Sequence, residues 1–154
     1  MESVVKRSAR AIVIDDQGYL VLIKRTKPGT APYWTAPGGG VEPDDPSVEA
    51  ALVRELREEL GAEVDSAQQV FLVSNPAGAG IGVQHFFVCH LRKVDLAQRS
   101  GPEFDDPARG GYDLDRVTLT NDDLGQVDLK PAELRTFVMA NRVALLDAAG
   151  FRKG

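Results

Sequence analysis

A chain of 154 residues that is 43% hydrophobic and 27% charged has the composition of a globular protein and excludes a disordered one, and its length suits one domain over residues 1–154. A formal net charge of −5 excludes a general nucleic-acid-binding protein, which would carry a basic surface. No apolar run approaches the roughly 20 residues of a membrane span, and the single cysteine and the charged N-terminal segment predict a cytoplasmic protein. These data leave a homodimer open.

Two strands joined by a tight turn are predicted near the N-terminus. Residues 9–14 and 19–25 are apolar and rich in β-branched side chains, and the sequence Asp-Asp-Gln-Gly between them suits a hairpin turn. An extended segment, residues 33–37, then leads into three consecutive glycines at positions 38–40.

A helix is predicted over residues 46–60, because apolar side chains recur there with helical period. Asp45 is the expected N-cap, with a proline at the first helical position, and Gly61 is the expected end of the helix. The apolar face of this helix consists of Leu52, Val53, Leu56 and Leu60.

The second half of the chain predicts three strands, a loop and a helix. The strands are residues 64–73, 82–94 and 115–119, and the helix is residues 131–149. Residues 97–111 are polar and rich in glycine, proline and acidic side chains, which predicts a long loop of the kind that often carries function. Because strands precede and follow one central helix, the pattern predicts an α+β fold.

Four charged side chains lie on the face of the predicted helix opposite its leucines: Arg54, Glu55, Glu58 and Glu59. The like charges of Glu55 and Glu59, one turn apart, destabilise an isolated helix by roughly 0.2–0.5 kcal/mol, whereas a hard cation such as Mg²⁺ favours them. Arg54 precedes Glu58 by one turn and can fix its carboxylate. A solvated surface would explain the helix alone, but three glycines directly before it favour a site, because they let the backbone approach a phosphate or metal.

The run from Gly39 to Ala62 resembles the Nudix box, whose family pattern is G-x5-E-x7-R-E-U-x-E-E-x-G-U, with U an aliphatic residue. The preceding Trp-Thr-Ala-Pro-Gly-Gly, residues 34–39, is similar to the strand and loop that lead into the box in this family. The second half of the pattern is matched at every fixed position, by Arg54, Glu55, Leu56, Glu58, Glu59 and Gly61, followed by Ala62.

The first half of the pattern is broken by one residue. Counting back from Arg54 places the box glutamate at Pro46, whereas counting forward from Gly39 places it at Asp45. We interpret this as a one-residue insertion at the start of the helix, with Asp45 in place of the glutamate. A plain N-cap explains Asp45 equally well.

The resemblance implies a Nudix-type α/β/α sandwich, in which a mixed sheet is flanked by the box helix and a C-terminal helix. It also implies a metal-dependent pyrophosphohydrolase that acts on acid anhydrides. The expected partner is a small nucleotide-like substrate, a nucleoside diphosphate linked to another moiety, and the expected cofactor is Mg²⁺ or Mn²⁺.

By analogy with the family, the metal ligands are expected to be Glu55, Glu58, Glu59 and the backbone carbonyl of Gly39 or Gly40. One carboxylate could also act as the catalytic base, and Glu58 is the candidate. Arg54 is expected to orient this cluster rather than to contact substrate.

Further candidates lie outside the box helix. Arg25 and Lys27 close a strand just before the glycine loop, where a substrate phosphate would lie together with Gly40, although ordinary surface cations would look the same. Trp34 could stack on a base or simply pack against the sheet. In the long loop, Glu103 is the candidate for an extra carboxylate.

The loop offers two alternatives to Glu103, namely Asp105 and Asp106, and all three could be merely solubilising. Substrate choice stays open between a nucleoside triphosphate and an ADP-ribose-type compound, because specificity lies outside the box. A non-catalytic Nudix-like domain that binds a nucleotide as a sensor is the alternative from another class. We would expect such a domain to have lost box carboxylates, which this chain retains.

Overall fold

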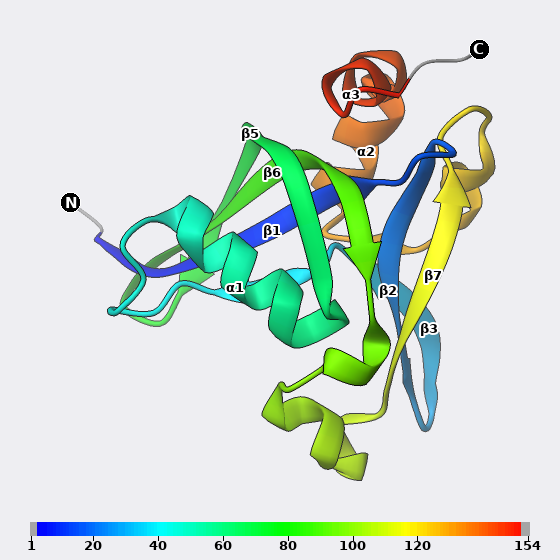
Figure 1. Cartoon of the computed structure of the whole chain (residues 1–154). Coiled ribbons are helices and arrows are strands. Elements are labelled where there is room, and N and C mark those ends of the chain that lie inside the picture. Colours follow the sequence, from blue (N-terminus) through cyan, green and yellow to red (C-terminus); the bar gives the residue numbers. More distant parts are fainter. Residues whose placement is uncertain (1–2, 152–154) are drawn as a thin grey trace.

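The computed structural model describes residues 3–151, without the side chains of Pro102 and Asp105. Within this range the chain forms one eight-stranded sheet, three α-helices and four short 3₁₀ segments (Figure 1). The strands are β1 (Val4–Ile14), β2 (Tyr19–Lys27), β3 (Thr30–Thr35), β4 (Gly38–Gly40), β5 (Ala62–Ala77), β6 (Gly80–Val94), β7 (Gly111–Thr118) and β8 (Leu129–Lys130). The helices are α1 (Val48–Leu60), α2 (Ala132–Ala140) and α3 (Arg142–Ala148).

The sheet is mixed, as expected. Its main strand order is β5-β6-β1-β2-β3-β8, while β4 pairs with β1 and β7 pairs with β2. The β1–β6 and β3–β8 pairs are parallel and all other pairs are antiparallel. Pairing with β1 places β4, and with it the three glycines, beside the centre of the sheet.

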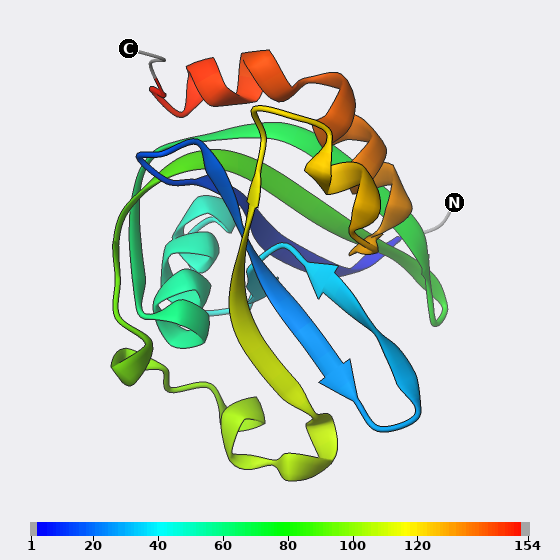
Figure 2. The same cartoon turned by 90° about the vertical axis from the view of Figure 1, so that its right-hand side faces the viewer.

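Alternation along the strands produces a separate apolar core on each face of the sheet. In β1, Ala11 and Val13 belong to the core under α1, whereas Ile12 and Ile14 belong to the core under α2 and α3. Figures 1 and 2 show α1 on one side of the sheet and α2 with α3 on the other. The helices contribute Ala51, Leu52, Leu56 and Leu60 to the first core and Leu134, Val138 and Leu145 to the second. The α/β/α sandwich is therefore confirmed.

The start of the box helix differs from the prediction. Ser47 is the N-cap, and its Oγ accepts a hydrogen bond from the backbone N–H of Ala50 at 3.0 Å. Asp45 and Pro46 therefore lie before the helix. The N-cap interpretation of Asp45 is wrong, because the carboxylate of Asp45 accepts hydrogen bonds from Arg54 instead. Gly61 ends the helix as expected, in the left-handed conformation at φ 60°.

One other expectation is corrected. The C-terminal helix is interrupted at Asn141, whose amide donates to the carbonyl of Phe137 at 2.8 Å, so that α2 and α3 are separate helices. The predicted loop contains three short 3₁₀ segments, η1 (Leu96–Gln98), η2 (Pro102–Asp105) and η3 (Pro107–Arg109). None of the helices in residues 3–151 combines the length and the apolar character that crossing a bilayer requires.

Candidate active site

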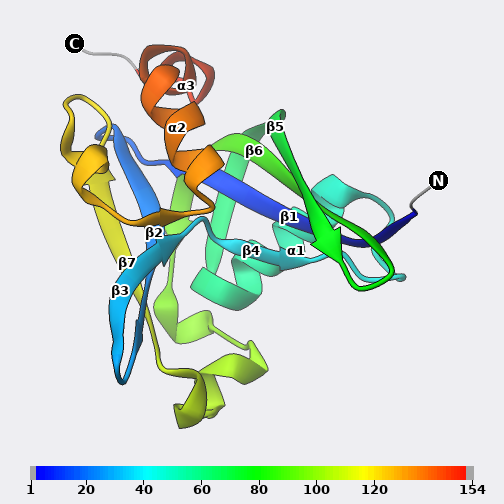
Figure 3. The same ribbon diagram turned by 180° about the vertical axis from the view of Figure 1, so that it is seen from behind.

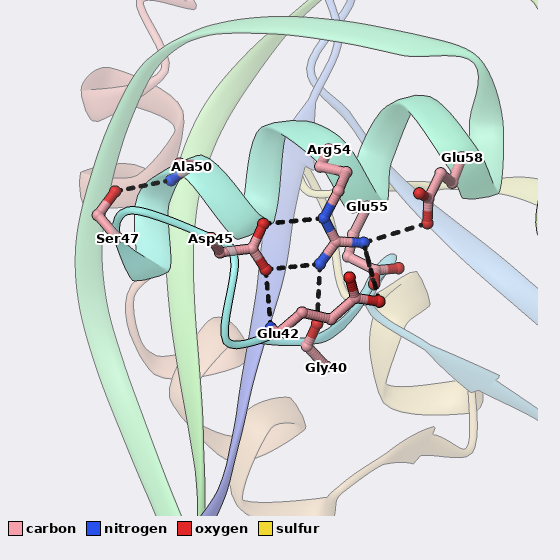
Figure 4. A network of polar contacts seen from close by, with 8 residues as sticks. All are labelled: Gly40, Glu42, Asp45, Ser47, Ala50, Arg54, Glu55 and Glu58. Carbon is pink, nitrogen blue, oxygen red and sulfur yellow. Dashed lines mark hydrogen bonds and ion pairs between the residues drawn. The ribbon is translucent and has the colours of Figure 1, made fainter.

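Arg54 is the centre of a polar network between α1 and the segment that precedes it (Figure 4). Its Nε and Nη2 donate to the two carboxylate oxygens of Asp45 at 2.9 and 2.7 Å. Nη2 also donates to the carbonyl of Gly40 at 3.1 Å. On its other side, Nη1 donates to Glu55 at 2.9 Å and to Glu58 at 3.2 Å. Arg54 therefore joins the glycine strand to the carboxylates of the helix.

The carboxylate of Asp45 is held in place by Arg54. Its carboxylate is only 8% exposed and also accepts the backbone N–H of Glu42 at 2.8 Å. The hydrogen bonds from Arg54 lower the pKa of Asp45 to about 2. Asp45, the residue reached by counting forward from Gly39, thus supports the cluster through an ion pair.

The box glutamates occupy three different environments. The side chain of Glu55 is 16% exposed, and that of Glu58 is 39% exposed. Glu59 points toward the start of β4, where its Oε1 accepts the backbone N–H of Gly38 at 3.2 Å. Burial raises the pKa of Glu55, and it raises the pKa of Glu59 to about 7.

Two glycines of β4 allow these close approaches. At Gly38, φ is +142° and a Cβ would collide with the carbonyl oxygen of Ala9 on β1. At Gly39, a Cβ would collide with the carboxylate of Glu55. Gly38 and Gly39 therefore let β4 fit between β1 and the acidic face of α1.

Glu103 is brought to the same region by η2. The loop just before η2 is attached to α1, because the backbone N–H of Ser100 donates to the carbonyl of Glu58 at 3.0 Å. The negative charge of Glu103 adds to the burial that raises the pKa of Glu55 and Glu59. Asp106 instead accepts the backbone N–H of Ala108 and pairs with Arg109 at 3.4 Å. The side chain of Asp105 lies outside the described residues.

The donor set fits a hard divalent cation. Glu55, Glu58, Glu59 and Glu103 offer only oxygen, which suits Mg²⁺ or Mn²⁺. Among residues 3–151 no three acidic, histidine or cysteine side chains converge closely enough to enclose an ion by themselves. A Mg²⁺ ion can complete its coordination shell with water and substrate phosphate.

The predicted substrate-binding side chains have other contacts. The guanidinium of Arg25 donates to the carbonyls of Arg109 and Gly111 and lies 3.6 Å from the ring centre of Tyr112. Lys27 is exposed at the end of β2. The indole N–H of Trp34 donates to Asp115 at 2.8 Å, and its ring packs on the core under α2.

Arg25 and Trp34 therefore hold β2 and β3 to β7. The carbonyl of Gly40 is likewise engaged by Arg54. Gly39 pairs with Ala9 in the β1–β4 ladder.

The sequence reasoning missed Arg10. It lies opposite Gly38 in the β1–β4 pairing, and its Nη1 donates to the carbonyl of Ala36 at 3.0 Å. Its charge offsets part of the rise that burial causes in the pKa of Glu59. Arg10 also lines a polar cleft of about 260 Å³. The side chains that give the cleft its polar character are Lys6, Ser8, Arg10, Asn75 and Gln84.

A signal for this cleft was present in the sequence. Lys6, Ser8 and Arg10 alternate with period two and continue the face of Ile12. The predicted strand begins at residue 9, whereas β1 begins at Val4 and includes Lys6 and Ser8.

Comparison with known proteins agrees with the geometry. A family model described as NUDIX domain matches residues 5–131. The CTP pyrophosphohydrolase of Escherichia coli (strain K12) is 44% identical over 61 residues, which are 39% of this chain and 44% of that protein. This match spans less than half of either chain.

Solved structures of similar fold cover most of the chain. The E. coli ORF135 protein is 28% identical with a TM-score of 0.64, over 90% of this chain and 91% of that one. A MutT NUDIX hydrolase from Burkholderia pseudomallei is 27% identical with a TM-score of 0.59, over 84% and 94% of the two chains. The NUDIX domain of Shewanella oneidensis NrtR, solved with ADP ribose, shares the fold at 18% identity and a TM-score of 0.65, over 94% and 90%. The chain belongs to the Nudix hydrolase family.

Proposed function

We propose that this chain is a single Nudix domain, residues 1–154, that hydrolyses the pyrophosphate bond of a nucleoside diphosphate linked to another moiety. Mg²⁺ or Mn²⁺ would serve as its cofactor. The observation that carries the proposal is the network of Arg54, which connects β4 to Glu55 and Glu58 on one face of α1.

The chain's own residues have distinct roles in this proposal. Glu55, Glu58 and Glu59, with the carbonyl of Gly39, would hold the cation, which neutralises the diphosphate and lowers the pKa of the attacking water. Glu58 forms an ion pair with Arg54, and its side chain is the most exposed of the three glutamates. It is therefore the candidate for accepting the proton of the attacking water. Glu103 faces the same region from the loop and could share either task.

The polar cleft beside Arg10 suits the rest of the substrate. Lys6 and Arg10 supply positive charge for a phosphate. Ser8, Asn75 and Gln84 supply hydroxyl and amide groups that can bind a base or sugar. CTP, from the name of the E. coli relative, and ADP-ribose, from the solved NrtR domain, are the first compounds to test.

The test is release of phosphate and pyrophosphate from a panel containing nucleoside triphosphates and ADP-ribose, with Mg²⁺ and with Mn²⁺. Hydrolysis of at least one compound that EDTA abolishes would support the proposal. The same panel decides the sensor alternative, because a sensor would bind a nucleotide without turnover. Arg10→Met should raise KM for the active compound if the cleft binds it.

A further inference from the structure

The loop that carries Glu103 is attached to the C-terminal end of the box helix. The last carbonyls of a helix lack partners within the helix, and here the loop supplies them. Ser100 donates its backbone N–H to the carbonyl of Glu58 at 3.0 Å, and Asp95 donates to the carbonyl of Gly61 at 3.0 Å. Between these contacts, Arg99 donates from Nε to the carbonyl of Glu59 at 2.8 Å. A cation at this end also agrees with the helix dipole.

The guanidinium of Arg99 also reaches the part of the loop next to Glu103. Its Cζ lies 4.6 Å from the ring centre of Phe104, a cation–π contact. Phe104 packs edge-on against Tyr112 of β7, with ring centres 5.4 Å apart. On β2, the Cζ of Arg25 lies 3.6 Å from the ring centre of Tyr112, which is a second cation–π contact. A continuous series of contacts therefore runs from α1 through the loop to β7 and β2, and Figure 2 shows the loop passing from β6 to β7 beside these elements.

The carboxylate of Glu103 lies against Gly101 within this series of contacts. Gly101 is buried, and a Cβ built on it would lie 2.5 Å from Oε1 of Glu103. The carboxylate therefore folds over the glycine. The next residue, Phe104, contacts Arg99, which donates to the end of the helix that bears Glu58 and Glu59.

We propose that Arg99 is a positioning residue that holds Glu103 beside the box glutamates by joining the loop to the end of α1. The inference rests on the proposed function, in which these carboxylates bind the cation. Arg99 is anchored through Nε, which donates to the carbonyl of Glu59, and through its contact with the ring of Phe104.

The test is a double-mutant cycle read as Mn²⁺ affinity, measured from free Mn²⁺ by electron paramagnetic resonance. Arg99→Met keeps the stem of the side chain and removes the guanidinium. If Arg99 acts through Glu103, Arg99→Met and Glu103→Gln should each weaken Mn²⁺ binding several-fold. The double variant should bind no more weakly than Glu103→Gln alone, because the two residues would act as a unit.

Three controls separate positioning from general damage. Arg92→Met removes the same charge from a side chain that is 65% exposed and should leave affinity unchanged. Gly101→Ala should weaken binding as Glu103→Gln does, because it displaces the carboxylate without removing it, and it serves if Arg99→Met does not fold. Arg99→Lys should restore affinity only in part, because lysine keeps the charge without the planar stacking group.

Additive losses in the double variant, or wild-type affinity in Arg99→Met, would overturn the assignment. The assignment would also be overturned if Arg99→Met lowered the Mn²⁺ affinity while Glu103→Gln and Gly101→Ala did not. A wild-type protein that binds Mn²⁺ but hydrolyses no nucleotide would contradict the proposed function alone, since this test reads affinity rather than turnover.

Discussion

Arg54 and Asp45 form a two-pronged ion pair, at 2.9 and 2.7 Å, that ties the middle of α1 to the segment before it (Figure 4). The pair explains how the chain tolerates an extra residue between Gly39 and Arg54. Ser47 is the N-cap of the helix, and Asp45 instead binds Arg54. The Nη1 of Arg54 contacts Glu55 and Glu58.

Asp45→Ser should therefore lower both stability and turnover, whereas an N-cap would have tolerated serine. The matched control is Ser47→Ala, which removes the actual N-cap and should cost about 1 kcal/mol of unfolding free energy while leaving turnover near wild type. Urea unfolding and kcat on the same preparations check both. If Asp45→Ser behaves as wild type in both measurements, the ion pair has no supporting role.

The same pair should be visible in the pH dependence of stability. The folded state lowers the pKa of Asp45 from 3.8 to about 2, so the folded protein binds the proton less readily than the unfolded chain. The stabilisation is then complete above pH 4 and disappears as the pH falls from about 4 to 2. The difference in unfolding free energy between wild type and Asp45→Asn, measured at several pH values, should follow this course. A difference that grows on acidification would contradict it.

Glu59→Gln should lose activity while gaining stability. Burial raises the pKa of Glu59 from 4.5 to about 7, so ionising it in the metal-free protein costs folding free energy above pH 4.5. In EDTA the variant should thus unfold at a higher temperature than wild type at pH 8, and the two should converge at pH 4. With saturating Mg²⁺, kcat should fall roughly 100-fold or more if the carboxylate is a ligand worth several kcal/mol. Retention of more than half of the turnover would remove Glu59 from the metal site.

Cys89 should be unreactive in the folded protein. It is fully buried in the core under α1, and burial raises the pKa of its thiol to about 12. A chromogenic disulfide reagent at pH 8 should react only at the rate of unfolding, and at once in denaturant. Rapid stoichiometric reaction of the native protein would show that the β1–β6 region opens readily.

The structural features that depend on the spacing of nearby residues could be predicted from the sequence. The spacing of Leu52, Leu56 and Leu60, with Gly61 after them, placed α1 and most of its buried face. Val53 was assigned to the same face but is 43% exposed. The box residues from Arg54 to Gly61 predicted the acidic face and, through the family, both helix layers of the sandwich. Figure 3 shows these layers from behind, with β4 passing close to α1.

The remaining features depend on contacts between distant residues, which spacing does not reveal. Asp45 suits an N-cap and an ion pair equally until the position of Arg54 in space is known. Asn141 carries no strong helix-breaking signal, yet the helix ends there. The contacts of Trp34 with Asp115 and of Arg25 with Gly111 span 81 and 86 positions in the chain. Arg99 gave no signal at all, because its partner is a backbone carbonyl of α1.

The central claim is that the carboxylates arranged around Arg54 bind a divalent cation and hydrolyse a phosphoanhydride. Its most direct test is ³¹P nuclear magnetic resonance of the best substrate of the panel, incubated with Mg²⁺ and wild type or Glu58→Gln. We expect wild type to split the pyrophosphate bond, EDTA to stop the reaction, and Glu58→Gln to slow it roughly 100-fold or more, the loss expected of a ligand worth several kcal/mol. Hydrolysis that continues in EDTA, or that proceeds equally well in a folded Glu58→Gln protein, would contradict the account.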